Sequence, residues 1–121
     1  MISNTQQQVL EQLQALRREY AIKLPEVLAH LASTARQLEA SAENEKRKPE
    51  LLQQLYQELH KLAGSAGSFG FDGLSKAARE QELAIKAWLA GQLPAAAQLS
   101  DFVAEIESFT RFIQAPGPKV A

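Results

Sequence analysis

Two histidines carry most of the chemistry that this sequence could perform, because the chain contains no cysteine. The absence of cysteine excludes thiolate catalysis, disulfides and cysteine-ligated zinc. His60 is followed within ten residues by three glycines, Gly64, Gly67 and Gly70. The other histidine, His30, lies on the flank of a helical apolar stripe, and we interpret it as an ordinary surface residue. The surroundings of His60 therefore decide what the chain could do.

Three kinds of histidine chemistry make different demands on the residues around His60. A metal site needs three or four ligands, and we expect none, because no second ligand lies at helical spacing from His60. General acid–base catalysis needs a cleft and acidic companions, which this helical strip does not offer. An exposed imidazole is largely neutral near pH 7 and can attack phosphorus without a pocket of its own. The residue types therefore favour a phosphoryl carrier over an enzyme.

Small residues share a helical strip with His60. At 100° per residue, His60 lies about 130° from the centre of the apolar stripe, so we expect it to be exposed. Gly64 and Gly67 lie on its strip and Ala63 lies at the edge, although each helical glycine costs about 1 kcal/mol relative to alanine. The glycines could clear space for a phosphoryl-sized group and a bulky partner. Alternatively, they permit close contact between helices, or the helix ends early near Ala63.

Helices must position these residues, because apolar residues recur at helical spacing and no segment alternates with period two. The pattern predicts five helices, over residues 4–20, 25–42, 49–69, 73–90 and 94–113. Pro25, Pro49 and Pro94 each lie at the start of one of them, and Asp72 is placed to cap the fourth. We therefore predict an all-α fold, an up-down four-helix bundle with an additional N-terminal helix packed across one end.

Length and composition limit the other classes of function. The 121 residues predict one helical domain over residues 1–114, and the Pro and Gly in residues 115–121 are typical of a flexible tail or linker. A net charge of −1 gives no basic patch for nucleic acid. No apolar run approaches the ~20 residues that a membrane span requires. We expect a cytoplasmic protein that is monomeric as an isolated domain.

One residue does not fit the predicted pattern. Gln81 falls near the centre of the apolar stripe of the helix over residues 73–90. A buried amide without a hydrogen-bond partner costs about 1–3 kcal/mol. Either Gln81 finds a partner, or the helix is rotated relative to the predicted stripe.

The segment around His60 resembles a known family signature. Residues 59–70 read Leu-His-Lys-Leu-Ala-Gly-Ser-Ala-Gly-Ser-Phe-Gly, and residues 74–80 read Leu-Ser-Lys-Ala-Ala-Arg-Glu. This pattern is similar to that of histidine-containing phosphotransfer (HPt) domains of bacterial two-component phosphorelays. The resemblance implies a four-helix bundle whose exposed histidine exchanges a phosphoryl group with the aspartate of receiver domains. It also implies a phosphocarrier without catalytic activity and without a cofactor of its own, because the receiver domain holds the Mg²⁺.

The resemblance also implies roles for single residues. His60 would be the phosphoacceptor, through Nε2, Gly64 would leave room beside the ring, and Ser65 occupies the family's frequent serine position. Many family members have a lysine where this chain has Ala63. Lys61 is our candidate to replace that lysine, and a solvated side chain is the alternative.

A polar residue of the next helix and a docking surface complete the predicted site. Glu82 matches the position at which family members hydrogen-bond the phosphohistidine, although an exposed charge ladder of Arg79, Glu82 and Lys86 explains it equally well. The predicted partner-docking residues are Tyr56, Gln57, Ala63 and Gly67. Two other functions stay open, the phosphorylated domain of a chemotaxis-type histidine kinase and a helical interaction module that is not phosphorylated.

Overall fold

The computed structural model describes residues 4–114, all of whose regular structure is helical. This observation confirms the all-α class. The predicted tail, residues 115–121, lies outside the described residues. None of the described helices is long and apolar enough to cross a membrane. The elements are α1 (Asn4–Ala40), α2 (Arg47–Ser68), α3 (Asp72–Ala90), α4 (Ala96–Glu107), a 3₁₀ turn (Ser108–Thr110) and the short α5 (Arg111–Gln114).

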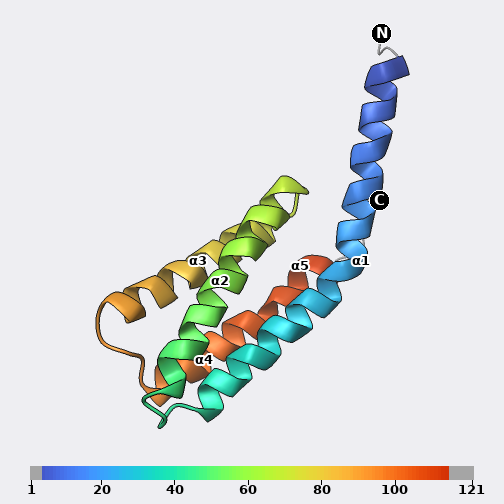
Figure 1. The fold of residues 1–121 in the computed structure, drawn as a ribbon. Coiled ribbons are helices and arrows are strands. Elements are labelled where there is room, and N and C mark those ends of the chain that lie inside the picture. Colours follow the sequence, from blue (N-terminus) through green and yellow to red (C-terminus); the bar gives the residue numbers. More distant parts are fainter. Residues whose placement is uncertain (1–3, 115–121) are drawn as a thin grey trace.

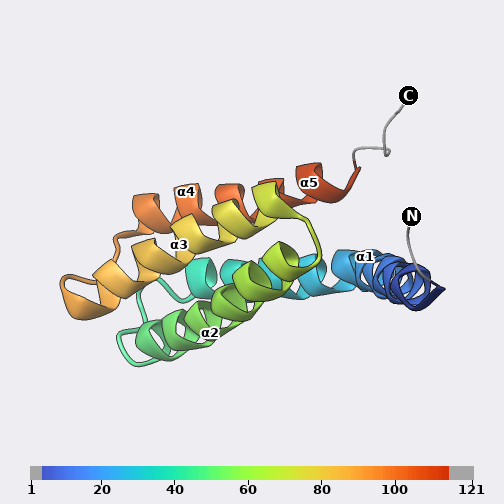
Figure 2. The same ribbon diagram turned by 90° about the horizontal axis from the view of Figure 1, so that it is seen from above.

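Four of these helices form the predicted bundle. α2 and α3 form an antiparallel hairpin, and α4 returns alongside α1 (Figures 1 and 2). Each helix contributes an apolar face to one core, as the helical spacing predicted. Fully buried core side chains include Leu24, Leu31, Leu38, Leu51, Leu52, Leu55, Leu59, Leu74, Ile85, Leu99, Ile106 and Phe109. The up-down four-helix bundle is therefore confirmed.

The predicted break between the first two helices is wrong, because α1 runs without interruption from Asn4 to Ala40 with Pro25 inside it. Proline lacks an N–H and its ring crowds the carbonyl four residues earlier, so it can bend a helix without ending it. Figure 1 shows α1 changing direction near its middle. Leu24 and Leu28, on both sides of the proline, are buried in the core, and this burial favours continuation of the helix.

The additional N-terminal helix is consequently the first part of α1. It projects beyond the bundle and does not pack across its end, as Figure 1 shows. Its large apolar side chains are about half exposed: Val9, Leu10, Leu13 and Leu16. Tyr20 ties α1 to the hairpin, because its ring stacks on that of Phe69 at 4.7 Å between centroids.

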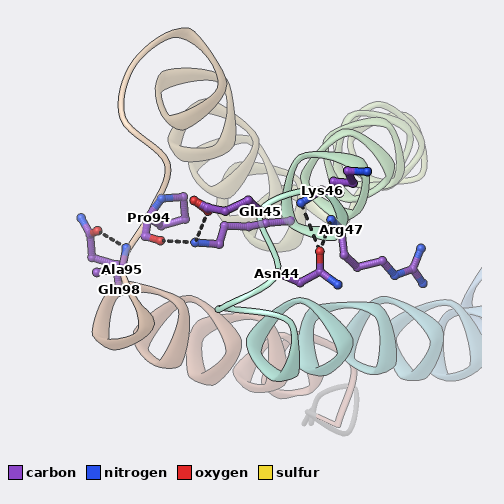
Figure 3. A network of polar contacts seen from close by, with 8 residues as sticks. Asn44, Glu45, Lys46, Arg47, Pro94, Ala95 and Gln98 are labelled. Carbon is purple, nitrogen blue, oxygen red and sulfur yellow. Dashed lines mark hydrogen bonds and ion pairs between the residues drawn. The ribbon is translucent and has the colours of Figure 1, made fainter.

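Polar contacts join the two loops at the opposite end of the bundle (Figure 3). The buried Lys48 donates from Nζ to the carbonyl of Pro94 at 3.3 Å. Asn44 Oδ1 accepts from the backbone N–H groups of Lys46 (3.1 Å) and Arg47 (3.0 Å), where α2 begins. The two bonds to Asn44 satisfy backbone N–H groups that the start of α2 leaves without partners.

Two smaller predictions also need correction. The helix predicted over residues 94–113 begins at Ala96 and is divided by the 3₁₀ turn, so α4 and α5 are separate. Asp72 does not cap α3, because it is the first helical residue and Phe71 occupies the N-cap position. An acidic side chain in the first turn still interacts favourably with the helix dipole.

The rotation of α3 resolves the position of Gln81. Gln81 is half-buried, whereas the next residue, Glu82, is only 9 % exposed. α3 is thus turned relative to the predicted stripe, toward α2. This rotation brings a carboxylate to the edge of α2 that carries His60.

Candidate functional site

His60 projects from the hairpin formed by α2 and α3. Its neighbour Leu59 is fully buried in the core, whereas the His60 side chain is 71 % exposed. This difference follows from the 100° that separates successive side chains on a helix. The predicted exposure of His60 is therefore confirmed.

A carboxylate of α3 holds one nitrogen of the imidazole. His60 Nδ1 lies 2.7 Å from Oε2 of Glu82, whose side chain is 12 % exposed. An ionised carboxylate only accepts hydrogen bonds, so the proton of a neutral His60 ring resides on Nδ1. Nε2 then carries the lone pair on the exposed ring. The arrangement fixes the tautomer and the orientation of a potential nucleophile.

The charge ladder that was an alternative explanation for Glu82 is not formed. Glu82 is buried against α2, and its carboxylate contacts His60. Arg79 and Lys86 are exposed, and within residues 4–114 neither forms an ion pair with it. Glu82 is thus bound across the hairpin and does not belong to a solvated row of charges.

The two glycines on the His60 strip serve different purposes. A Cβ atom added to Gly64 would meet nothing within 4 Å, so packing does not require glycine there. A Cβ atom at Gly67 would lie 3.1 Å from Oγ of Ser75 on α3. Gly67 therefore permits close approach of the two helices, whereas Gly64 leaves open space one turn after the histidine.

Ala63 does not belong to the docking surface that the sequence predicted. It is 2 % exposed, because it lies on the side of α2 that α3 covers. Its carbonyl accepts a hydrogen bond from Ser75 Oγ at 2.6 Å. Ser75 was not among the predicted residues, although its spacing of seven residues from Glu82 places both on one face of α3.

The other predicted docking residues remain near the surface. Gln57 and Gly67 are exposed, and Tyr56 is half-buried; Gly64, predicted to leave room beside the ring, is exposed as well. The ring of Tyr56 stacks against that of His60, with centroids 6.3 Å apart and planes inclined by 16°. The exposed imidazole is thus flanked by an aromatic ring on one side and by open space on the other.

Ser65 and Lys61 lie on the opposite edge of α2, toward α1. Ser65 Oγ pairs with the hydroxyl of Tyr20 at 2.7 Å and so ties α1 to α2. Lys61 borders a groove between α1 and α2 with Tyr20 and Val27. The structure therefore brings together His60, Glu82, Tyr56 and Gly64, and does not bring Ser65 to the imidazole.

His30 provides an internal comparison. It is 65 % exposed on α1, as predicted for a surface residue, but its Nε2 lies 3.1 Å from Oε2 of Glu58. Nε2 is thus occupied at His30, whereas at His60 the contact is made by Nδ1 and no described residue bonds to Nε2. Within residues 4–114, no cluster of three His, Cys, Asp or Glu side chains could hold a metal ion.

Comparison with known proteins agrees with this geometry. The sequence model of one family, described as the Hpt domain, matches residues 1–111. No curated protein and no solved structure matches the chain. The family match covers most of the chain and confirms the resemblance that the segment around His60 indicated.

Proposed function

The chain belongs to the Hpt domain family, and from that premise we propose that it is a phosphorelay intermediate whose His60 exchanges a phosphoryl group with receiver domains. Histidine phosphotransfer in two-component signalling is the general role of this family, whose members are phosphocarrier modules. The observation that carries the proposal is the His60–Glu82 pair. In the neutral ring this pair places the proton on Nδ1, so Nε2 carries the lone pair on a side chain that is 71 % exposed.

The proposed reaction is a reversible displacement at phosphorus. The Nε2 lone pair of His60 attacks the phosphorus of an aspartyl phosphate on the receiver, and the bond from phosphorus to the aspartate oxygen breaks. The aspartate leaves as a carboxylate, and the histidine becomes a phosphorylated imidazolium. Glu82 accepts the Nδ1–H and stabilises this positive ring, since hydrogen bonds between charged groups are stronger than neutral ones.

The partner supplies the remaining parts of the chemistry. We propose that the receiver domain holds the Mg²⁺ and places its aspartyl phosphate in line with Nε2. The proposed docking surface is formed by Tyr56, Gln57, Gly64 and Gly67, beside His60. Transient signalling contacts lie at the small end of interface sizes, below about 1,200 Å². Exchange with receivers would take place in the cytoplasm.

A labelling experiment tests this proposal. The chain is incubated with a receiver domain phosphorylated with ³²P, and the stability of the protein-bound label is measured in acid and in alkali. We expect an acid-labile, alkali-stable label that His60→Gln abolishes and His30→Gln, the matched control, leaves intact. A label that persists in His60→Gln would overturn the assignment.

The source of the phosphoryl group separates the alternatives. Label that comes only from ATP and a kinase catalytic core, and from no receiver, would instead assign the chain as the phosphorylated domain of a chemotaxis-type kinase. No label from either source would leave a helical interaction module.

A further inference from the structure

A phosphoryl group on His60 creates an electrostatic problem at this site. The phosphoryl group would add about two negative charges at pH 7. The Glu82 carboxylate, 2.7 Å from the same ring, already contributes one. Within residues 4–114, no cation contacts either His60 or Glu82, and Ala63 stands where the resemblance implies a lysine. The charge of a phosphorylated His60 must therefore be offset from elsewhere.

The contacts of the hairpin define which residues of α3 lie level with the site. The helices are antiparallel, with Glu82 against His60 and Ser75 against Gly67. Arg79 lies midway between Ser75 and Glu82, so it lies level with Ala63 and Gly64. Lys86 lies one turn beyond Glu82, level with Tyr56. A cation of α3 is thus placed on each side of His60 along the hairpin.

Both cations also lie on the solvent side of the interface. At 100° per residue, Arg79 and Lys86 lie about 60° and 40° from Glu82 around the axis of α3. Both lie on the side of Glu82 that faces away from the buried Ala78 and Ile85. Both are exposed, and among the described residues no hydrogen bond or ion pair holds either of them. The space over Gly64 is open, because an added Cβ would meet nothing within 4 Å. A guanidinium group from Arg79 therefore has room to extend toward the imidazole.

We propose that Arg79, together with Lys86, binds the phosphoryl group on Nε2 of His60 and replaces the lysine that is absent at Ala63. Arg79 contributes two parallel hydrogen bonds to phosphoryl oxygens through its planar guanidinium, and Lys86 contributes a point charge. Lys61 is a poorer candidate, since it borders the groove toward α1 and lies on the other edge of α2. This inference rests on the proposed phosphorylation of His60.

A small phosphoryl donor tests the proposal without receiver docking. The chain is labelled with phosphoramidate, and the second ionisation of the phosphohistidine is followed by ³¹P NMR between pH 5 and 9. Nearby cations favour the dianion, so the wild type has the lower phosphoryl pKa. We expect Arg79→Gln to raise this pKa by about half a unit, as an exposed ion pair predicts, and Arg79→Lys to restore part of the shift. Lys86→Gln should raise it less, and the double variant most.

Lys76→Gln is the matched control, because Lys76 is an exposed cation of α3 that lies about 120° around the helix from Glu82. It should leave the phosphoryl pKa unchanged. A double variant that titrates like Lys76→Gln would overturn this inference alone, since His60 would still be labelled. Absence of any label on wild-type His60 would instead overturn the proposed function, and this inference with it.

Discussion

At the scale of single residues, the orientation of His60 depends on one carboxylate. We predict that Glu82→Ala slows phosphoryl transfer from a receiver by about tenfold, because it removes a hydrogen bond to a charged group worth at least about 1.4 kcal/mol. Glu82→Gln retains an acceptor for Nδ1–H and should slow transfer less. Transfer rates and ¹⁵N NMR of the imidazole tautomer provide the measurements.

Glu58→Ala is the matched control for this prediction, because Glu58 holds His30 and not His60. It should change neither the transfer rate nor the tautomer of His60. If Glu82→Ala kept the Nδ1–H tautomer fully populated, the proposed role of the carboxylate would be wrong.

The space beside the ring leads to a second prediction at this scale. Gly64→Ala should increase the free energy of unfolding by about 1 kcal/mol, since the added Cβ meets no other atom and alanine is the better helix former. Gly64→Leu should remain folded but should slow transfer from a receiver at least about tenfold, because its side chain fills the open space. Urea denaturation and transfer kinetics measure the two effects. An unchanged rate in Gly64→Leu would contradict the argument from clearance.

The sequence predicted the exposure of His60 but misplaced Ala63. A helical wheel gives the angle of a side chain from the apolar stripe of its own helix. The wheel does not show which neighbouring helix covers the residues beside that stripe. Ala63 is buried because α3 lies close to it, where Gly67 and Ser75 meet. The family resemblance indicated Glu82 as a hydrogen-bond partner of His60. The distance between the two residues along the chain did not by itself distinguish such a partner from a solvated charge.

At the scale of elements, the turn between α2 and α3 sets the register that the site needs. Phe71 N–H donates to the Ala66 carbonyl at 2.8 Å, and Gly70 N–H donates to that of Gly67 at 3.3 Å. These bonds form a Schellman motif, whose residue Gly70 has φ of +87°. The left-handed backbone at Gly70 therefore ends α2 and directs α3 back along it.

We predict that Gly70→Ala lowers the free energy of unfolding by about 1–2 kcal/mol, because a Cβ is strained in this conformation. Urea denaturation measures the loss. Gly64→Ala, a substitution inside α2 for which we expect a change of the opposite sign, is the comparison. Equal effects of the two substitutions would show that helix propensity alone determines the role of both glycines.

Two differences between the predicted and observed helices have physical causes. Pro25 suggested a helix start because proline fits the first turn, yet burial of Leu24 and Leu28 favours one bent helix. Gln81 is only half-buried, because α3 is turned so that the carboxylate of Glu82 faces α2 and contacts His60. The apolar periodicity of one segment does not reveal such tertiary contacts. It did predict the ends of α2 and α3 to within two residues.

At the scale of the whole molecule, the site and the N-terminal part of α1 are separate. All four helices of the bundle contribute side chains to one core. The hairpin that carries His60 therefore packs against the rest of the bundle through this core. Residues 4–14 are exposed throughout and lie beyond the bundle (Figure 1). Tyr20 is anchored to the hairpin by Ser65 and Phe69. We infer that the cooperative unit of folding begins near Tyr20.

We therefore predict that deletion of residues 1–14 changes the free energy of unfolding by less than about 0.5 kcal/mol, the range of surface changes, and leaves phosphoryl transfer unaltered. The helical circular dichroism signal should fall, since α1 loses its first turns. Tyr20→Ala, the comparison within α1, should cost about 2 kcal/mol because it removes the stack on Phe69 and the bond to Ser65. Urea denaturation at several protein concentrations measures both. A larger, concentration-dependent loss on deletion would show that a second copy covers Val9, Leu13 and Leu16, and the expected monomeric state would then be wrong.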